Sequence, residues 1–102
     1  MWYDERKIIR EDVMVAVISV IGRDSVGIIA DVSAKCREYH ANIVDISQTV
    51  LQNYFAMIML VEIDQLTASF GDFIDAMDKL GKAKQLSIHT MHEDVFNAMH
   101  KI

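Results

Sequence analysis

The spacing of apolar residues changes several times along this chain of 102 residues, and each change predicts a boundary between two elements. Residues 13–21, VMVAVISVI, form a continuous run of mostly β-branched and apolar side chains, which predicts a central strand bounded by Gly22. From Ser25 onward the spacing is helical. Residues 25–40 are therefore predicted to form an amphipathic helix, whose apolar face carries Ile28, Ile29, Val32, Cys36 and Tyr39.

Two apolar runs in the middle of the chain are separated only by Gln52 and Asn53, so they predict an antiparallel hairpin. In residues 42–51 apolar and polar positions alternate, and the apolar side carries Val44, Ile46 and Val50. Residues 54–63, YFAMIMLVEI, are apolar on both sides. The second strand of the hairpin therefore needs cover on both of its faces.

The last third of the chain predicts a helix, a strand and a short terminal helix. Apolar residues at helical spacing mark the first of these: Leu66, Phe70, Phe73, Ile74, Met77 and Leu80. We expect Thr67 or Ser69 to cap the start of this helix and Gly81 to lie just past its end. Residues 84–92 are predicted as a strand. Residues 93–102 are predicted as a terminal helix with four side chains pointing inward: Val95, Phe96, Met99 and Ile102.

The resulting order, βαββαβ with a helical tail, predicts an α+β fold of the ferredoxin-like class. In that fold a four-stranded antiparallel sheet carries two helices on one face, here with a short C-terminal helix added. Residues 1–12 are predicted to be a charged N-terminal extension and residues 13–102 a single domain. Because two helices cover only one face, we expect a homodimer to cover the other, with the segment around Trp2 and Tyr3 adding cover.

Composition narrows the range of partners. Fifteen acidic and ten basic side chains give a net charge of −5, which repels nucleic-acid phosphates and anionic lipid headgroups at long range. We therefore expect no nucleic-acid partner and no membrane partner. The single cysteine, Cys36, excludes an intramolecular disulfide, and the chain has no uninterrupted run of about 18 apolar residues. Both observations favour a cytoplasmic protein.

The loop GRDSVG, residues 22–27, joins the first strand to the first helix and is a candidate binding site. The unpaired N–H groups at the start of the helix attract a carboxylate, and they belong to Val26, Gly27 and Ile28. Asp24 can bind an ammonium group and Asn42 offers both a donor and an acceptor, so together they suit a zwitterion. A purely structural interpretation competes: Asp24 or Ser25 caps the helix, and Asn42 takes a left-handed conformation after it.

Other residues with reactive side chains give weaker patterns. Gly27 is followed by two isoleucines instead of Lys and Ser or Thr, so the loop is not a Walker loop. His89 and His92 are three positions apart on a predicted strand and point to opposite faces, so they cannot chelate one ion. Cys36 lies on an apolar helix face, as a buried thiol does. We expect neither a metal nor a cofactor.

The stretch VIGRDSVGIIADVSAKCREYHANIVDISQTV resembles the ACT domain, a small amino-acid-sensing module attached to many biosynthetic enzymes. The shared features are the glycine-containing loop, the helix after it and the NIVDIS strand, although many ACT loops have proline where this chain has Val26. Together with YFAMIMLVEI and the ending HEDVFNAMHKI, the stretch is similar to the stand-alone ACT-domain proteins of bacteria and archaea. The resemblance covers residues 13–102.

This resemblance implies a regulatory module, not an enzyme, that binds an amino acid between the first loop and the start of the second strand, often across a dimer interface. Carried onto this sequence, the implied site residues are Asp24, Ser25, Val26, Gly27, Ile28, Asn42 and Ile43. Two alternatives stay open. One is an acylphosphatase-like hydrolase that uses Arg23 and Asn42, and the other is a protein-interaction module without a ligand.

Overall fold

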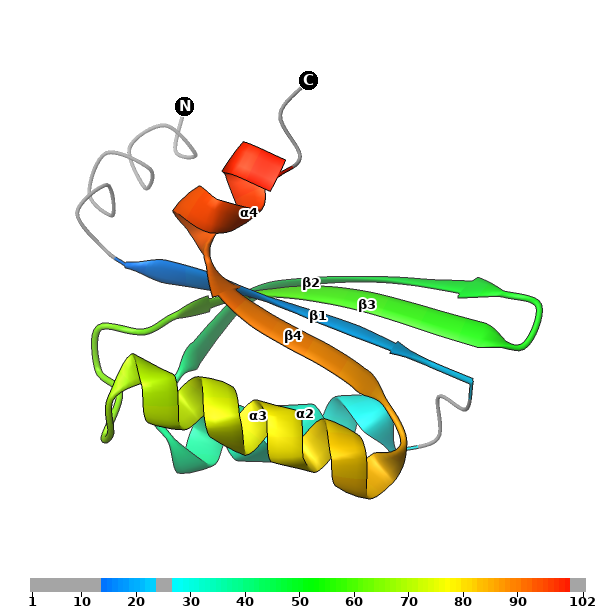
Figure 1. Cartoon of the computed structure of the whole chain (residues 1–102), viewed down its shortest axis with the longest axis horizontal. Helices are drawn as coiled ribbons and strands as arrows, with labels where there is room; N and C mark the ends of the chain where they lie inside the picture. The colour runs from blue at the N-terminus through cyan, green and yellow to red at the C-terminus, as the bar shows by residue number, and fades with distance from the viewer. Residues whose placement is uncertain (1–13, 24–26, 100–102) are drawn as a thin grey trace.

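Four strands and three helices form the part of the chain that this computed structural model describes, residues 14–23 and 27–99. In chain order they are β1 (Val15–Gly22), α2 (Ile28–Glu38), β2 (Asn42–Leu51), β3 (Tyr54–Glu62), α3 (Phe70–Lys84), β4 (Ser87–His92) and α4 (Glu93–Met99). Neighbouring strands pair antiparallel in the order β2-β3-β1-β4. Helices α2 and α3 lie on one face of the sheet (Figure 1). The predicted ferredoxin-like α+β fold is confirmed.

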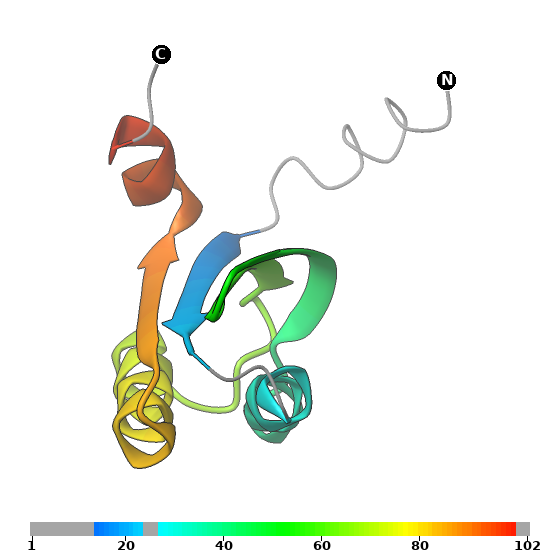
Figure 2. The ribbon, with the colours of Figure 1, turned by 90° about the vertical axis from the view of Figure 1, so that its right-hand side faces the viewer.

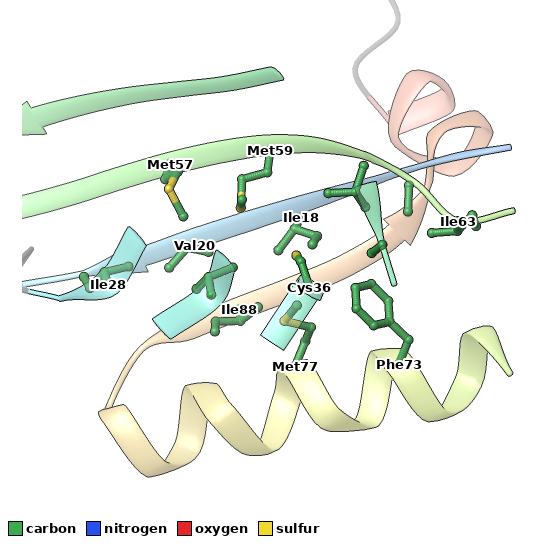
Figure 3. Packing of buried hydrophobic residues seen from close by; sticks show 14 of the residues in the cluster. Ile18, Val20, Ile28, Cys36, Met57, Met59, Ile63, Phe73, Met77 and Ile88 are labelled. Atoms are coloured by element: carbon green, nitrogen blue, oxygen red, sulfur yellow. The ribbon is translucent and has the colours of Figure 1, made fainter. Parts of the chain in front are cut away.

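The hydrophobic core lies between the sheet and these two helices. The register places Met59 of β3 opposite Ile18 of β1, so both side chains point to the face that the helices cover. Cys36 of α2 and Phe73 of α3 are completely buried against them (Figure 3). Alternate residues of β3 are buried in this core, namely Phe55, Met57, Met59 and Val61. Ile58, on the other face, is exposed, so the prediction that β3 is apolar on both faces is confirmed.

Helix α3 begins as predicted but ends later. Ser69 is its N-cap residue, and the Ser69 hydroxyl accepts the Asp72 N–H at 3.1 Å. The prediction that Gly81 lies just past the helix is wrong, because the helix continues through it to Lys84, and Gln85 is the C-cap residue in a left-handed conformation. Gly81 is instead a point of close approach: a Cβ there would lie 2.8 Å from the carbonyl oxygen of Leu86. Its role is therefore set by tertiary packing.

The two C-terminal elements also differ from their predicted forms. Strand β4 starts at Ser87 rather than at residue 84, because α3 extends through Lys84. Helix α4 lies past the end of β4, on the side of the sheet away from α2 and α3 (Figure 1). The prediction that Val95 and Met99 point inward is wrong, since they are 50% and 64% exposed at a distance from the core. Ile102 lies outside the described residues.

Strand β2 is an edge strand with incompletely covered apolar side chains. Ile46 and Val50 point to the same side as the buried β3 residues opposite them, and a bulge between Ile43 and Asp45 interrupts the ladder. The β2–β3 hairpin reaches past α2 and α3, so the helices do not cover its far end (Figure 1). Four apolar residues of β2 are exposed, and we call three of them, Val44 (40% exposed), Ile46 (37%) and Val50 (67%), the β2 strip; the fourth is Leu51 at the end of the strand.

Candidate ligand-binding site

The first half of the predicted site lies where β1 leads into α2. Gly27 is the N-cap residue of α2, with a left-handed backbone (φ 75°), and its carbonyl oxygen accepts the Asp31 N–H at 2.9 Å. The interpretation in which Asp24 or Ser25 caps this helix is wrong, because Gly27, which has no side chain, holds the cap position. Ile28 begins the helix and is buried in the core. Three predicted site residues lie outside the described part of the chain: Asp24, Ser25 and Val26.

The second half of the predicted site lies at the start of β2. Asn42 is exposed, and its Nδ2 donates a hydrogen bond to Oε1 of Glu62 on β3 at 3.0 Å. The interpretation of Asn42 as a left-handed residue after the helix is wrong, because His40 takes that conformation with φ 60°. Ile43 is half-buried against the core. The Asn42 amide still has a second N–H and its Oδ1 oxygen, with which it can contact a ligand.

One chain holds these two halves far apart. Gly22, which leads into the loop, pairs with Phe55 of β3, whereas Asn42 pairs with Glu62 near the other end of that strand. Positions 55 and 62 are about 20 Å apart along an extended strand. Helix α2, with 11 residues, runs back over about 16 Å in the opposite direction. A molecule the size of an amino acid cannot reach both halves of the site within one copy of the chain.

A hollow of about 460 Å³ opens beside the second half, where α2 ends and β2 begins. Two predicted site residues, Asn42 and Ile43, line it. The sequence pattern did not indicate the other four lining residues, which are Ser33, Arg37, His40 and Ala41. The available signal was the spacing of Ser33 and Arg37, which places two polar side chains on the same side of the predicted helix. The hollow adds a hydroxyl and basic groups to the Asn42 amide.

The end of α2 brings these residues together. The His40 N–H donates to the Arg37 carbonyl oxygen at 3.1 Å, and the Ala41 N–H donates to the Cys36 carbonyl oxygen at 2.8 Å. This pair of bonds, with His40 in the left-handed conformation, is a Schellman motif, and it turns the chain directly into β2. Cys36 and Ala41, at the two ends of this motif, are both buried in the hydrophobic core. Arg37, in the last helical turn, is thereby brought next to the first residues of β2.

Comparison with known proteins identifies the family. The sequence profile of the ACT domain matches residues 15–91. The chain belongs to the ACT-domain family. A UPF0237 protein of Listeria innocua is 46% identical over 89 residues, which are 87% of this chain and 100% of that protein. An ACT domain protein from Streptococcus pneumoniae superimposes with a TM-score of 0.73 at 38% identity and covers 86% of this chain and 99% of its own.

A more distant structure shares only the fold. A formyltetrahydrofolate deformylase from Pseudomonas syringae pv. tomato superimposes with a TM-score of 0.77 at 16% identity, over 89% of this chain and 31% of the deformylase. The resemblance to small stand-alone ACT-domain proteins is confirmed by the matches to full-length relatives. ACT domains are typically regulatory modules that bind small ligands. This ACT domain carries its candidate site at the two ends of α2.

Arg23 lies at the loop end of this ACT domain. Its guanidinium stacks on Tyr54, with Cζ 5.5 Å from the ring centroid, and donates a hydrogen bond to the Tyr54 hydroxyl at 3.4 Å. The acylphosphatase-like alternative needs Arg23 and Asn42 to hold the same substrate. Because these residues lie at opposite ends of the sheet, one copy of the chain does not form that pair.

The remaining reactive side chains of this ACT domain do not form a site. His89 pairs with Ser19 and His92 with Ala16, so the two imidazoles point to opposite faces, as predicted. Within residues 14–23 and 27–99, no group of three or more His, Cys, Asp or Glu side chains could hold a metal ion. Burial raises the pKa of the Cys36 thiol to about 11, which disfavours the thiolate. No helix in these ranges is long and apolar enough to cross a membrane.

Proposed function

We propose that this ACT domain is a regulatory module that binds an amino acid and acts as a homodimer. The separation of the two halves of the site carries the proposal. A two-fold axis beside the middle of β2 would bring the Gly27 end of one copy to the Asn42 end of the other. Each ligand would then touch both copies, and its binding would stabilise the dimer. Such coupling between ligand binding and assembly is a means of regulation.

The location of both halves on one side of the molecule supports this arrangement. Helix α2 lies under the β2 side of the sheet and α3 under the β4 side (Figure 2). The β2 strip lies on the same side, and burying it against a second copy would remove apolar surface from water. The Asp45 carboxylate already accepts the Ile46 N–H at 2.9 Å, so side chains of the strip, more than a continuous strand ladder, would make the contact.

The chemistry of the two halves fits a zwitterion. Backbone N–H groups at the start of α2 favour a carboxylate, and Gly27 allows close approach because it has no Cβ. At the other end the Asn42 amide supplies both a donor and an acceptor, and the carboxylate of Glu62 lies within hydrogen-bonding distance of that amide. An α-amino acid, with one anionic and one cationic group close together, matches both ends.

A thermal-shift screen of the common amino acids tests the proposal. A ligand at about 100 times its dissociation constant adds about 2.7 kcal/mol to the stability of the folded state, which raises the melting temperature clearly. We expect a response to a small subset of the panel. A flat response across the panel would contradict amino-acid binding and favour the interaction module without a ligand.

Titration calorimetry then tests the position of the site. We expect Asn42→Ala to weaken binding of the amino acid found in the screen about tenfold, because the ligand loses a polar partner. Asn97→Ala, in α4 on the side of the sheet away from α2 (Figure 1), is the matched control and should leave the affinity unchanged. Equal affinities for all three proteins would mean that the site lies elsewhere. Gly27→Ala is a poor probe of binding because its positive φ strains any other residue.

Several expectations from the sequence stay predictions. The net charge of −5 favours partners other than nucleic acid and membranes, and the single cysteine favours a cytoplasmic location. The division into an extension, residues 1–12, and one domain, residues 13–102, is also proposed on the sequence pattern.

A further inference from the structure

The hollow beside Asn42 is basic, although the chain as a whole is acidic. Arg37 and His40 are among its six lining residues and no acidic residue is, while the net charge of the chain is −5. Within the described ranges, the Arg37 guanidinium has no hydrogen-bond or ion-pair partner. By contrast, Lys35 of the same helix binds Glu38 at 3.2 Å and Lys84 of α3 binds Asp31 at 3.6 Å. Arg37 is therefore available to a ligand in the hollow.

The polar groups around Arg37 form a set suited to an anion. Ser33 precedes Arg37 by one helical turn, so their side chains lie on the same side of α2, and both line the hollow together with Asn42. The Ser33 hydroxyl can donate a hydrogen bond to an anionic group that the guanidinium holds, whereas the Asn42 Nδ2 already donates to the Glu62 carboxylate at 3.0 Å. A basic residue in the last turn also stabilises the helix dipole, but that role needs neither the hollow nor the neighbouring donors.

We propose that this hollow binds an anionic side group of the ligand, a carboxylate or a phosphate ester, and that Arg37 selects for it. The proposal rests on the function proposed above and names its ligand class. With the α-amino and α-carboxyl groups held between Asn42 and the α2 start of a second copy, the ligand side chain extends toward Arg37. The planar guanidinium can bind two oxygens of such a group at once. The domain would thus distinguish acidic amino acids from neutral ones of the same shape.

Calorimetric titration with matched pairs of ligands tests this selectivity. The probes are L-aspartate against L-asparagine, L-glutamate against L-glutamine and O-phospho-L-serine against L-serine. We expect the wild-type protein to bind one acidic member at least about tenfold more tightly than its neutral partner. Whether that member is a carboxylate or the phosphate ester identifies the anionic group.

Variants of α2 connect the preference to Arg37. Arg37→Gln should remove the preference by weakening the acidic ligand at least about tenfold while changing the affinity for its neutral partner less than about threefold. Arg37→Lys should restore part of it, since the charge returns without the planar fork. Lys35→Gln removes one positive charge from the same helix and is the control, which should keep the preference because Lys35 is paired with Glu38.

The outcomes separate the two proposals. If neutral members bind as tightly as acidic ones, or if Arg37→Gln keeps the preference, the inference about Arg37 is wrong while amino-acid binding stands. If no amino acid binds in the screen or in these titrations, both proposals are wrong. Circular dichroism of each variant confirms that it is folded, which is expected because Arg37 and Lys35 are not part of the buried core.

Discussion

Gly27 has a backbone conformation that other residues adopt only at a cost. Its φ is 75°, and the nearest neighbour of a Cβ built there is Oδ2 of Asp31 at 3.9 Å, so space is not the constraint. We expect Gly27→Ala to lower the free energy of unfolding by about 1 kcal/mol through backbone strain alone. The same substitution at Gly71, in the first turn of α3, should raise it by about 0.5 kcal/mol, because alanine is the better helix former.

Urea unfolding followed by circular dichroism measures both substitutions. The two changes should have opposite signs, although each replaces one hydrogen atom by a methyl group. A stabilised Gly27→Ala protein would mean that residue 27 is helical in solution, and the account of the α2 N-cap would then be wrong.

The Cys36 thiol links stability to pH. Burial raises its pKa from an ordinary value of 9.0 to about 11, so the unfolded chain loses its proton at lower pH than the folded one. The stabilisation from the neutral thiol is present below pH 9 and is lost as the pH rises toward 11. Between pH 8 and 10 the wild-type protein should lose about 1 kcal/mol of stability relative to Cys36→Ala, which has no thiol to titrate.

Chemical unfolding at a series of pH values measures that difference, and the comparison of the two proteins cancels the titration of all other groups. A difference that stays constant from pH 8 to 10 would contradict the raised pKa. Reaction with a thiol reagent gives an independent test: Cys36 should react slowly in the folded protein and rapidly in urea.

At the scale of the elements, the sequence predicts interiors better than ends. The alternation in β3 and the helical spacing in α2 and α3 arise because the sheet and the helices each bury one face in the core. The sequence pattern therefore indicates which residues are buried. Helix ends depend on where the chain must turn back to the sheet. His40 and Gln85 take left-handed conformations more often taken by glycine or asparagine, so their residue types do not mark these ends.

Gly81 shows the converse limitation, because a residue type that is typical of a helix end lies inside a helix here. A glycine after an apolar helical face is typical of a helix end, yet the role of Gly81 is to let α3 approach the chain leading into β4. A Cβ at this position would lie 2.8 Å from the Leu86 carbonyl oxygen and 3.1 Å from Cγ1 of Ile88. Only the three-dimensional packing of α3 against the chain leading into β4 shows this constraint.

At the scale of the whole molecule, the candidate site was only partly predictable. The residue pattern indicated Asn42 and the family resemblance added Ile43, and both line a hollow. Ser33 and Arg37 were missed because their relation to β2 depends on the Schellman turn at the end of α2, and helical spacing alone does not show which polar side chains face a strand. The distance between Gly27 and Asn42 follows from topology, since a helix that returns along the sheet separates the residues at its two ends.

Two exposed apolar surfaces compete for a second copy of the chain. One is the β2 strip, beside α2 and both halves of the site. The other is the open face of the sheet, where Ile21, Tyr54 and Ile58 are each more than 40% exposed. Packing through the open face is the arrangement expected from the sequence pattern, because it would cover the second face of β3, but it would leave the helix layer of each copy on the outside. Packing through the strip brings the two α2 helices together, and only this arrangement joins the halves of the site.

A charge introduced on each surface distinguishes these arrangements. Analytical ultracentrifugation of the wild-type protein at micromolar concentration should show a dimer. Ile46→Lys, near the middle of β2, should raise the dimer dissociation constant about 100-fold or more, because each copy would bring a buried like charge to the axis. Ile58→Lys, a change at a similarly exposed position on the open face, should leave the dimer intact.

Dissociation by Ile58→Lys alone would assign the interface to the open face, and a monomeric wild-type protein would reject the homodimer itself. Because a site divided between two copies requires the dimer, Ile46→Lys should also lose ligand binding while remaining folded, whereas a site complete in one chain would keep it.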